Sequence, residues 1–230
     1  MSLEEAEQAA QKVRRWKARV LRHRPLSPTA FELTLSREGL DFRAGQLLTV
    51  HGRTLYEDRN YSIASGEKDD HIQILYRLIP SGALTPQLAA LAEGDALEIS
   101  APSGEFMIRD RARPLVFIAT GTGIAPCRSY IRTHPDLAIT ILHGVRTAED
   151  LFYRDELSSL AYHPCLSADN SAEFRGRVTD LSKTFPFPDN AHFYLCGANE
   201  MFYDMRDILR ERNINPAAIF TEAYYYTHEV

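Results

Sequence analysis

Cysteine is scarce in this chain of 230 residues, which contains only Cys127, Cys165 and Cys196. Their number is odd and their spacings are long, so they suggest neither a disulfide framework nor the ligand set of a zinc or iron–sulfur site. We therefore expect no bound metal. Any redox chemistry would then require an organic cofactor.

Long apolar runs and an excess of positive charge are also missing. No segment reaches 18 apolar residues, and the acidic start, Met1 to Gln8, lacks the features of a secretory signal. The formal net charge of −5 argues against a general nucleic-acid binder, which is normally strongly basic. These absences predict a cytoplasmic protein with neither a membrane nor a nucleic acid as partner.

The first half of the chain has the pattern of an antiparallel β-barrel. Apolar and polar residues alternate from Phe31 to Ser36, after a short amphipathic helix predicted at 3–13. Further β-rich runs are separated by turns rich in Gly, Pro and Asp: 46–51, 59–64, 71–79 and 96–100. Short strands at such spacings favour a barrel with Greek-key connections.

The pattern changes near residue 112, after the charged segment 109–114. Continuous apolar runs, typical of buried parallel strands, now alternate with helical patterns. The strands are predicted at 115–119, 139–143 and 192–196, and the helices at 125–132, 150–160 and 199–212. We expect two domains, residues 1–112 and 113–230, the second of which is a doubly wound α/β sheet.

Two segments of the first half suit a ligand with phosphate and aromatic groups. Arg59-Asn60-Tyr61-Ser62 lies on a predicted strand, where Arg59 and Tyr61 share a face and offer a phosphate fork and a stacking surface. Gly82-Ala83-Leu84-Thr85 precedes a helical run and would present backbone amides to an anion. Taken singly, they also fit a half-buried strand and a glycine turn with a helix cap.

Two turns of the second half suit a dinucleotide. The segment 120–126, Thr-Gly-Thr-Gly-Ile-Ala-Pro, follows a buried strand and opens a helix, although Pro126 replaces the third glycine of G-x-G-x-x-G. Cys196 and Gly197 end another strand, so we expect them beside that turn on the ligand-binding edge of the sheet. A plain strand–helix turn and a small buried Cys196 are the alternatives.

The segment 220–226 combines aromatic residues with Glu222. An apolar aromatic setting would disfavour the charged carboxylate and let Glu222 carry protons near neutral pH, whereas a solvated acid is the alternative.

The order of these motifs resembles the ferredoxin–NADP reductase family over about residues 15–226. The sequence contains Phe42-Arg43-Ala44-Gly45-Gln46, Arg-x-Tyr-Ser, Gly-x-x-Thr, Pro102-Ser103-Gly104-Glu105-Phe106, Gly-Thr-Gly-Ile-Ala-Pro, Cys-Gly-x-x-x-Met and Glu-x-Tyr. The resemblance implies a flavin-binding barrel followed by a nucleotide-binding α/β domain. It also implies an enzyme that transfers hydride between NADPH and FAD, and single electrons to or from ferredoxin or flavodoxin.

The same resemblance implies roles for individual residues. Arg59 would hold the flavin phosphate, Tyr61 would stack on the ring, Ser62 would approach its N5 atom, and Tyr224 would act as a mobile cover. The residues implied to bind flavin are Arg59, Asn60, Tyr61, Ser62, Leu75, Tyr76, Arg77, Gly82, Ala83, Leu84, Thr85 and Tyr224. Those implied to bind the nucleotide around its pyrophosphate and nicotinamide are Thr120, Gly121, Thr122, Gly123, Pro126, Cys196 and Gly197. Ser62, Cys196 and Glu222 are the expected catalytic residues.

The choice of nucleotide and partner rests on positive charges. Arg146, Ser167, Arg175 and Arg177 are the candidates for binding a 2′-phosphate, although Ala168-Asp169 replaces the Arg that often follows the serine in NADP-using relatives. The cationic run from Lys12 to Arg24 suits an acidic carrier, or it is simply a solvated face. An NADH-dependent reductase serving an oxygenase or free flavin, a non-catalytic binding module, and FMN in place of FAD remain open.

Overall fold

The computed structural model describes residues 15–53, 57–169, 171 and 174–224, so the helix expected at 3–13 lies outside the described residues. The chain divides into two compact units. One comprises the residues up to Met107 together with Arg128–Thr133, and the other comprises Ile108–Cys127 together with the residues from His134 onward. The domain boundary at residue 112 remains a prediction.

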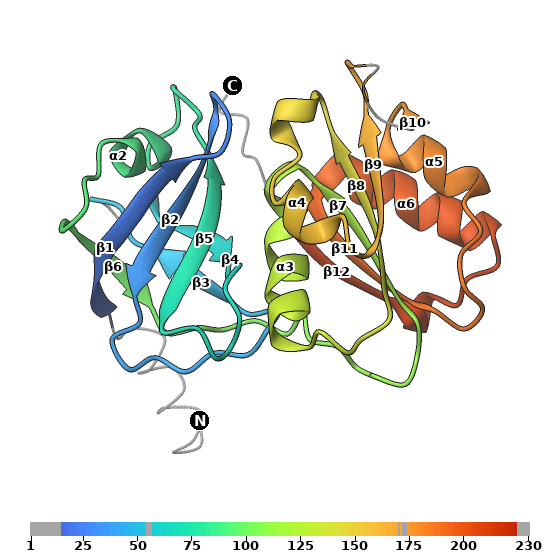
Figure 1. Ribbon diagram of the computed structural model, residues 1–230, viewed down its shortest axis with the longest axis horizontal. Helices are drawn as coiled ribbons and strands as arrows, with labels where there is room; N and C mark the ends of the chain where they lie inside the picture. Colours follow the sequence, from blue (N-terminus) through green and yellow to red (C-terminus); the bar gives the residue numbers. More distant parts are fainter. Residues whose placement is uncertain (1–14, 54–56, 170, 172–173, 225–230) are drawn as a thin grey trace. The chain divides into compact units, whose positions relative to one another are not determined.

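The first unit is an antiparallel near-barrel, as expected (Figure 1). Its strands are β1 (Arg15–Pro25), β2 (Ala30–Ser36), β3 (Leu47–Val50), β4 (Arg59–Ser62), β5 (His71–Arg77) and β6 (Ala96–Ser100), in the order β4-β3-β6-β1-β2-β5. An isolated bridge between Ile63 and Ile74 joins the end of β4 to β5. The short helix α2 (Thr85–Ala89) lies in the connection between β5 and β6.

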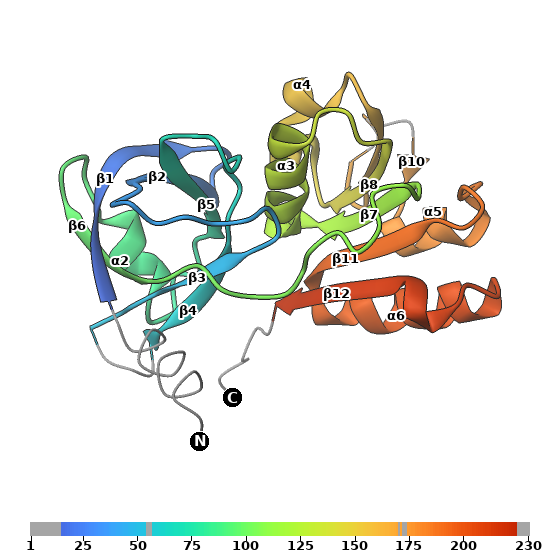
Figure 2. The same ribbon diagram turned by 90° about the horizontal axis from the view of Figure 1, so that it is seen from below.

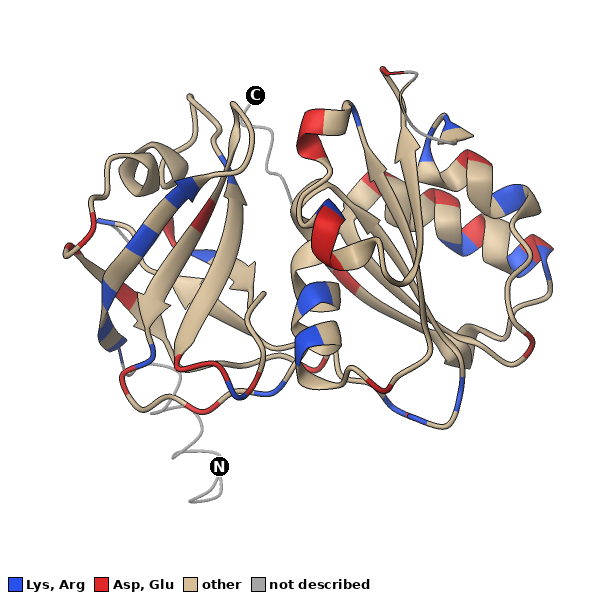
Figure 3. Cartoon of the chain, in the orientation of Figure 1, with Lys and Arg blue, Asp and Glu red and all other residues tan. Residues whose placement is uncertain are grey.

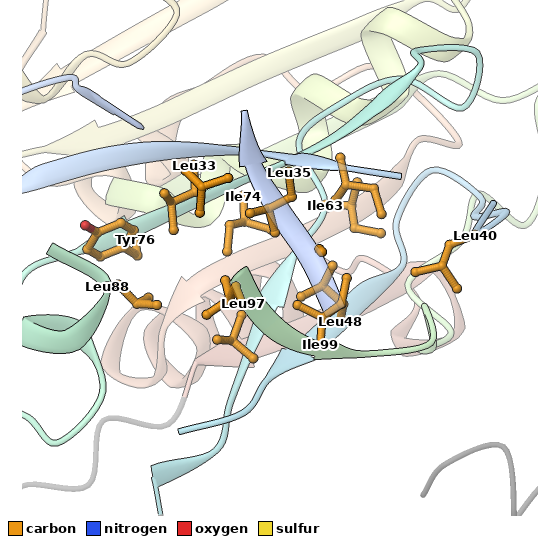
Figure 4. Packing of buried hydrophobic residues seen from close by; sticks show 14 of the residues in the cluster. Leu33, Leu35, Leu40, Leu48, Ile63, Ile74, Tyr76, Leu88, Leu97 and Ile99 are labelled. Atoms are coloured by element: carbon orange, nitrogen blue, oxygen red, sulfur yellow. The ribbon is translucent and has the colours of Figure 1, made fainter. Parts of the chain in front are cut away.

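Alternating side chains build the core of the barrel (Figure 4). Leu33, Leu35, Leu48, Ile74 and Ile99 are fully buried in one cluster. Such burial stabilises the fold by about 25 cal/mol for each Å² of apolar surface removed from water. The strand pattern therefore determines which face of each strand points inward.

The other face of β2 is also covered, which the alternation did not predict. Glu32 on that face is only 2% exposed. Its carboxylate lies 3.1 Å from a guanidinium nitrogen of Arg24 and 4.0 Å from one of Arg128. A charge can be buried here because two cations compensate for its lost hydration.

Strand β1 contains much of the cationic run seen in the sequence. Arg15, Lys17 and Arg19 are exposed, whereas Ala18 and Val20 are buried, so the three cations share the outer side of the strand. Blue bands along β1 in Figure 3 mark its cationic residues. The pairing register with β2 shifts between Val20 and Arg22. The run is thus a central strand of the barrel with one cationic side.

The second unit is a parallel sheet, as expected. It has six strands, of which the sequence predicted three, and Figure 2 shows several of them side by side. The strands are β7 (Leu115–Thr120), β8 (Ile139–Val145), β9 (Ala161–Leu166), β10 (Phe174–Arg175), β11 (His192–Ala198) and β12 (Ile219–Tyr224), in the order β10-β9-β8-β7-β11-β12. The direction of winding changes between β7 and β11, which makes their carboxyl ends the expected ligand position.

Helices cover both faces of this sheet. Figure 1 shows α4 (Arg154–Leu157) on one face, and α5 (Val178–Thr184) and α6 (Asn199–Glu211) on the other. Helix α3 (Ile124–Thr133) follows β7, and its residues are shared between the two units. The helices predicted at 125–132 and 199–212 are therefore confirmed to within two residues.

The helix predicted at 150–160 is wrong. The chain instead forms a 3₁₀ turn at Ala148–Asp150 and the single-turn helix α4 at Arg154–Leu157. Tyr153 separates them because it adopts a left-handed conformation with φ of 59°, which an α-helix cannot include.

Gly45 explains why the Phe-Arg-Ala-Gly-Gln segment requires glycine. Its φ is +86°, and a Cβ atom there would collide with the Phe106 carbonyl oxygen and the Tyr130 hydroxyl, which are hydrogen-bonded to each other. Gly94 has a similar φ of +95° but no atom within 4 Å of the corresponding position.

We predict that Gly45→Ala lowers the free energy of unfolding by about 3 kcal/mol or more, because backbone strain and overpacking add together. Gly94→Ala should lower the free energy of unfolding by only about 1 kcal/mol, because it adds the backbone strain without a collision. Urea unfolding of both variants measures the difference. Equal losses would show that the Phe106–Tyr130 contact does not constrain Gly45.

Candidate nucleotide and flavin sites

The glycine turn after β7 lies at the change in winding direction. Gly121–Gly123 form a 3₁₀ turn that leads into α3, and Gly121 has a left-handed φ of +53°. A Cβ atom on Gly123 would collide with the Cys196 carbonyl oxygen and approach within 2.9 Å of the Gly197 Cα atom. The second glycine is thus required by the neighbouring turn.

The turn after β11 packs against this first turn, as the sequence predicted. The Ala198 N–H donates to Thr120 Oγ1 at 3.0 Å. Gly197 has a φ of +135°, and a Cβ atom there would collide with the same hydroxyl and lie 2.9 Å from the Thr120 carbonyl oxygen. Two stretches of bare backbone therefore meet at the carboxyl edge. A surface without side chains fits the close approach of a pyrophosphate.

Cys196 and Glu222 come together on the adjacent strands β11 and β12. They are paired in register, and the Cys196 thiol lies 3.8 Å from Glu222 Oε2, within the reach of a weak S–H···O bond. Cys196 is buried and Glu222 is half-buried. The Tyr224 backbone pairs with Ala198, but the Tyr224 side chain lies outside the described part of the structure, as do residues 225–230.

The candidate 2′-phosphate residues follow three neighbouring strands. Arg146 follows β8, Ser167 follows β9, and Arg175 ends β10; all three are exposed. The register pairs Val145 with Leu166 and Leu166 with Arg175, so these positions are adjacent along the carboxyl edge. Their side chains can supply two cations and a hydroxyl to one anion.

Asp169 and Arg177 have local roles at this edge. The two carboxylate oxygens of Asp169 accept from the Ala148 and Ser171 N–H groups at 3.2 and 3.0 Å. Arg177 precedes α5, is exposed, and donates its backbone N–H to Asp180.

His143 is a buried residue that the sequence analysis did not identify. It is fully enclosed in β8, and its ring lies 2.9 Å from the Gly121 carbonyl oxygen and 3.0 Å from the Tyr162 hydroxyl. Burial lowers its pKa to about 4, against the opposing effects of the Gly121 hydrogen bond and the Asp150 carboxylate. A single histidine in an apolar run gives no sign of its partners, which come from distant segments.

In the barrel, Arg59 and Tyr61 share a face as expected. Both are half-buried, and Tyr61 packs against the core cluster. Asn60 is exposed and accepts from the Thr49 hydroxyl at 2.9 Å, whereas Ser62 is buried. Arginine with a phenol on one strand face is a donor set that fits a phosphate attached to an aromatic ring system.

On β5, Leu75 and Tyr76 are buried and Arg77 is half-buried. The Tyr76 hydroxyl lies 2.9 Å from His23 Nε2, and burial raises the pKa of Tyr76. Arg77 donates to the Thr29 hydroxyl at 2.9 Å. The Tyr76 side chain is occupied within the core, so only its backbone fits a ligand contact, as the resemblance implied.

The segment from Gly82 to Thr85 leads into α2. The Thr85 hydroxyl accepts from the Ile79 N–H at 2.9 Å and donates to the Ile79 carbonyl at 3.0 Å. Because that hydroxyl closes the 79–85 loop, a diphosphate here would depend on the backbone amides of the loop.

No cluster of three or more His, Cys, Asp or Glu side chains in the described ranges could hold a metal ion. Of the helices described, none combines the length and apolarity needed to cross a bilayer.

Two family profiles match the chain and together cover well over half of it. A profile described as "Oxidoreductase FAD-binding domain" matches residues 24–108, and one described as "Oxidoreductase NAD-binding domain" matches residues 117–207. This chain belongs to the ferredoxin reductase-like family of oxidoreductases. This reductase-like protein therefore has FAD-binding and NAD-binding domains, as the resemblance predicted.

Relatives of this chain include both a dioxygenase component and a ferredoxin–NADP reductase. It is 28% identical to the toluate 1,2-dioxygenase electron transfer component of Pseudomonas putida, over 91% of this chain and 67% of that protein. It is also 28% identical to a ferredoxin–NADP reductase of Pseudomonas aeruginosa, over 83% of this chain and 87% of that protein.

A solved structure shows the same fold. The cytochrome P450 reductase of Amycolatopsis has a TM-score of 0.81 and 27% sequence identity, with 91% of this chain and 69% of that one covered. This chain is 34% identical to methane monooxygenase component C of Methylosinus trichosporium. The match covers 64% of this chain but only 47% of that protein. Several curated relatives are therefore considerably longer.

The depressed pKa of His143 predicts a pH-dependent stability. Between pH 6.5, its ordinary pKa, and pH 4, the unfolded chain binds a proton that the folded chain excludes. Lowering the pH through this window should therefore cost about 3 kcal/mol of stability. His143→Gln lacks this contribution, so its urea unfolding midpoint should fall less steeply than that of wild type as the pH is lowered. Parallel pH profiles for the two proteins would contradict a neutral buried His143.

Proposed function

We propose that this protein is an NADPH-dependent flavoprotein reductase that binds FAD and exchanges single electrons with an acidic carrier, ferredoxin or flavodoxin. The observation that carries the proposal is the pair of interlocked turns at Gly123 and Gly197, beside Cys196 and Glu222. The ferredoxin–NADP reductase relative, most of whose length the chain spans, supports it. A cytoplasmic location follows from these partners and is part of the proposal.

In this proposal the flavin belongs to the barrel, residues 1–112. Arg59 binds its phosphate, Tyr61 stacks on its ring, and Asn60 and Ser62 complete the strand motif. The backbone of Leu75, Tyr76 and Arg77 contacts the ring. Gly82, Ala83, Leu84 and Thr85 bind the diphosphate through their amides. The role of mobile flavin cover that the resemblance implies for Tyr224 stays a prediction, because its side chain lies outside the described residues.

The nucleotide belongs to residues 113–230. Thr120, Gly121, Thr122, Gly123 and Pro126 receive its pyrophosphate. Cys196 and Gly197 border the nicotinamide. Bound flavin supplies the capacity to accept a hydride and release electrons singly. Ser62 in the first unit and Glu222 in the second are each proposed to carry protons, and Cys196 is proposed to position the nicotinamide.

NADPH is proposed because cationic residues stand at nearby strand ends on the carboxyl edge of the sheet. Arg146 and Arg175, with Ser167 between them on the strand ends, can neutralise a 2′-phosphate, and Arg177 is nearby in sequence. The Asp169 carboxylate accepts two backbone N–H groups and keeps its charge, so it acts against a 2′-phosphate.

An NADH-dependent reductase that serves an oxygenase is the second candidate. The absence of an arginine after Ser167 favours it, as does the toluate dioxygenase component among the relatives. A protein that binds flavin or nucleotide without turnover is the candidate from another class.

We predict that the purified protein is yellow with FAD and that NADPH bleaches its absorbance anaerobically. The kcat/KM for NADPH should exceed that for NADH at least about tenfold, because binding of the 2′-phosphate needs to contribute only ~1.4 kcal/mol for each tenfold. Rates with ferredoxin, flavodoxin and free FMN then identify the acceptor. A preference for NADH would favour the oxygenase-linked candidate. A yellow protein bleached by neither nucleotide would contradict enzymatic function.

The acidic carrier is proposed to meet the cationic side of β1. Arg15, Lys17 and Arg19 project from alternate positions of one strand, which gives a row of positive charge (Figure 3). Complementary charge mainly accelerates encounter, and its effect weakens with salt.

Lys17→Glu combined with Arg19→Glu should slow reduction of flavodoxin about tenfold at low salt and far less at high salt. Reduction of ferricyanide should not change. Arg206→Glu combined with Arg210→Glu on α6, both exposed, is the matched control. Equal effects of the two pairs on flavodoxin would show that the carrier does not meet β1.

A further inference from the structure

The interior of the second unit contains a short hydrogen-bonded chain that ends at the glycine turn. His143 lies in the middle of it, fully buried, with Nε2 2.9 Å from the Gly121 carbonyl oxygen and Nδ1 3.0 Å from the Tyr162 hydroxyl. The chain thus runs from β9 through β8 to the turn after β7. The family match and the strand pattern do not assign it a role.

The chemistry of the three groups determines where each hydrogen lies. A backbone carbonyl can only accept, so Nε2 of His143 must carry the hydrogen. The ring is neutral at physiological pH because burial depresses its pKa, so Nδ1 is left as an acceptor. Tyr162 supplies the matching donor, because burial raises the pKa of its hydroxyl and keeps it protonated. Both hydrogen bonds therefore point toward Gly121.

This chain fixes one peptide of the turn. The Gly121 carbonyl also accepts from the Ile124 N–H, so its two lone pairs are held by groups on different segments. In a trans peptide the C=O and the following N–H point in opposite directions. With the Gly121 carbonyl directed at His143, the Thr122 N–H is directed away from the buried ring. Gly121 adopts a left-handed φ of +53°, which glycine reaches without a steric penalty.

We propose that His143 is a positioning residue for the nicotinamide nucleotide: its Nε2–H holds the Gly121–Thr122 peptide in the orientation that presents the Thr122 N–H to the pyrophosphate. Tyr162 is part of the device because it keeps His143 in the required tautomer. This inference rests on the proposed nucleotide site.

The test compares two substitutions of similar size in the full-length, FAD-loaded protein. His143→Gln keeps an N–H donor that can reach Gly121, whereas His143→Leu removes it. We expect the KM for NADPH, and the Kd for NADP⁺ measured by difference absorbance, to rise about tenfold in the leucine variant and less than about threefold in the glutamine variant. The kcat at saturation and the flavin spectrum should stay within about twofold of wild type.

Ser182→Ala is the control, since Ser182 is a fully buried residue of the same unit that also donates to a carbonyl, that of Val178. It should leave the KM unchanged. A rise in KM for this control equal to that for His143→Leu would reduce the role of His143 to general core packing and overturn the proposal.

Nitrogen-15 NMR of the wild-type imidazoles provides a second test, which does not depend on the variants folding. His143 should show its hydrogen on Nε2 from pH 5 to 8, without titrating. A hydrogen on Nδ1, or nucleotide affinity in His143→Leu equal to wild type, would overturn the proposal. Wild-type protein that binds neither NADP⁺ nor NAD⁺ would instead refute the nucleotide site itself.

Discussion

The second unit depends on a contact between two stretches of backbone. Thr120 Oγ1 accepts from the Ala198 N–H, and Gly123 and Gly197 leave room for the two turns to meet. These turns end β7 and β11, the strands between which the winding of the sheet reverses. No Cβ atom fits at Gly123 or Gly197, so the backbone is exposed to close approach at these two positions. That is the physical requirement for binding a pyrophosphate.

Support for this edge comes from inside the sheet. A hydrogen bond to a carbonyl oxygen fixes the direction of the N–H group in the same peptide. His143 makes this hydrogen bond to the Gly121 carbonyl from inside the sheet. In the barrel, the Thr85 hydroxyl closes the 79–85 loop through Ile79. In both places side chains that need not touch a cofactor fix the backbone that would. His143 is a supporting residue outside the recognised motifs, whereas Thr85 belongs to one of them and supports the backbone with its hydroxyl.

The sequence predicted what depends on local pattern. Continuous apolar runs predicted β7, β8 and β11, and the Gly-Thr-Gly segment predicted a turn beside Cys196. Contacts between distant segments were not predictable in the same way. The burial of Glu32 requires Arg24 and Arg128, and the burial of His143 requires Gly121 and Tyr162.

Other misses arose from local exceptions. Strand β9 was not predicted because Pro164 interrupts its pattern. Among the described residues, β10 pairs with Cys165 and Leu166, which follow that proline. The helix at 150–160 failed at Tyr153, whose left-handed conformation the helical periodicity does not reveal. Strand β12 was treated as an aromatic tail, although its register with β11 is what brings Glu222 to Cys196.

The contact between the two turns can be tested directly with Thr120→Val, which keeps the side-chain shape but cannot accept from Ala198, and Thr120→Ser, which can. The account predicts that valine weakens NADP⁺ binding about fivefold or more, because losing the hydrogen bond leaves a backbone N–H unpaired at a cost of ~1–3 kcal/mol, while FAD stays bound. Serine should bind nearly as wild type. Wild-type nucleotide affinity in the valine variant would contradict the central claim.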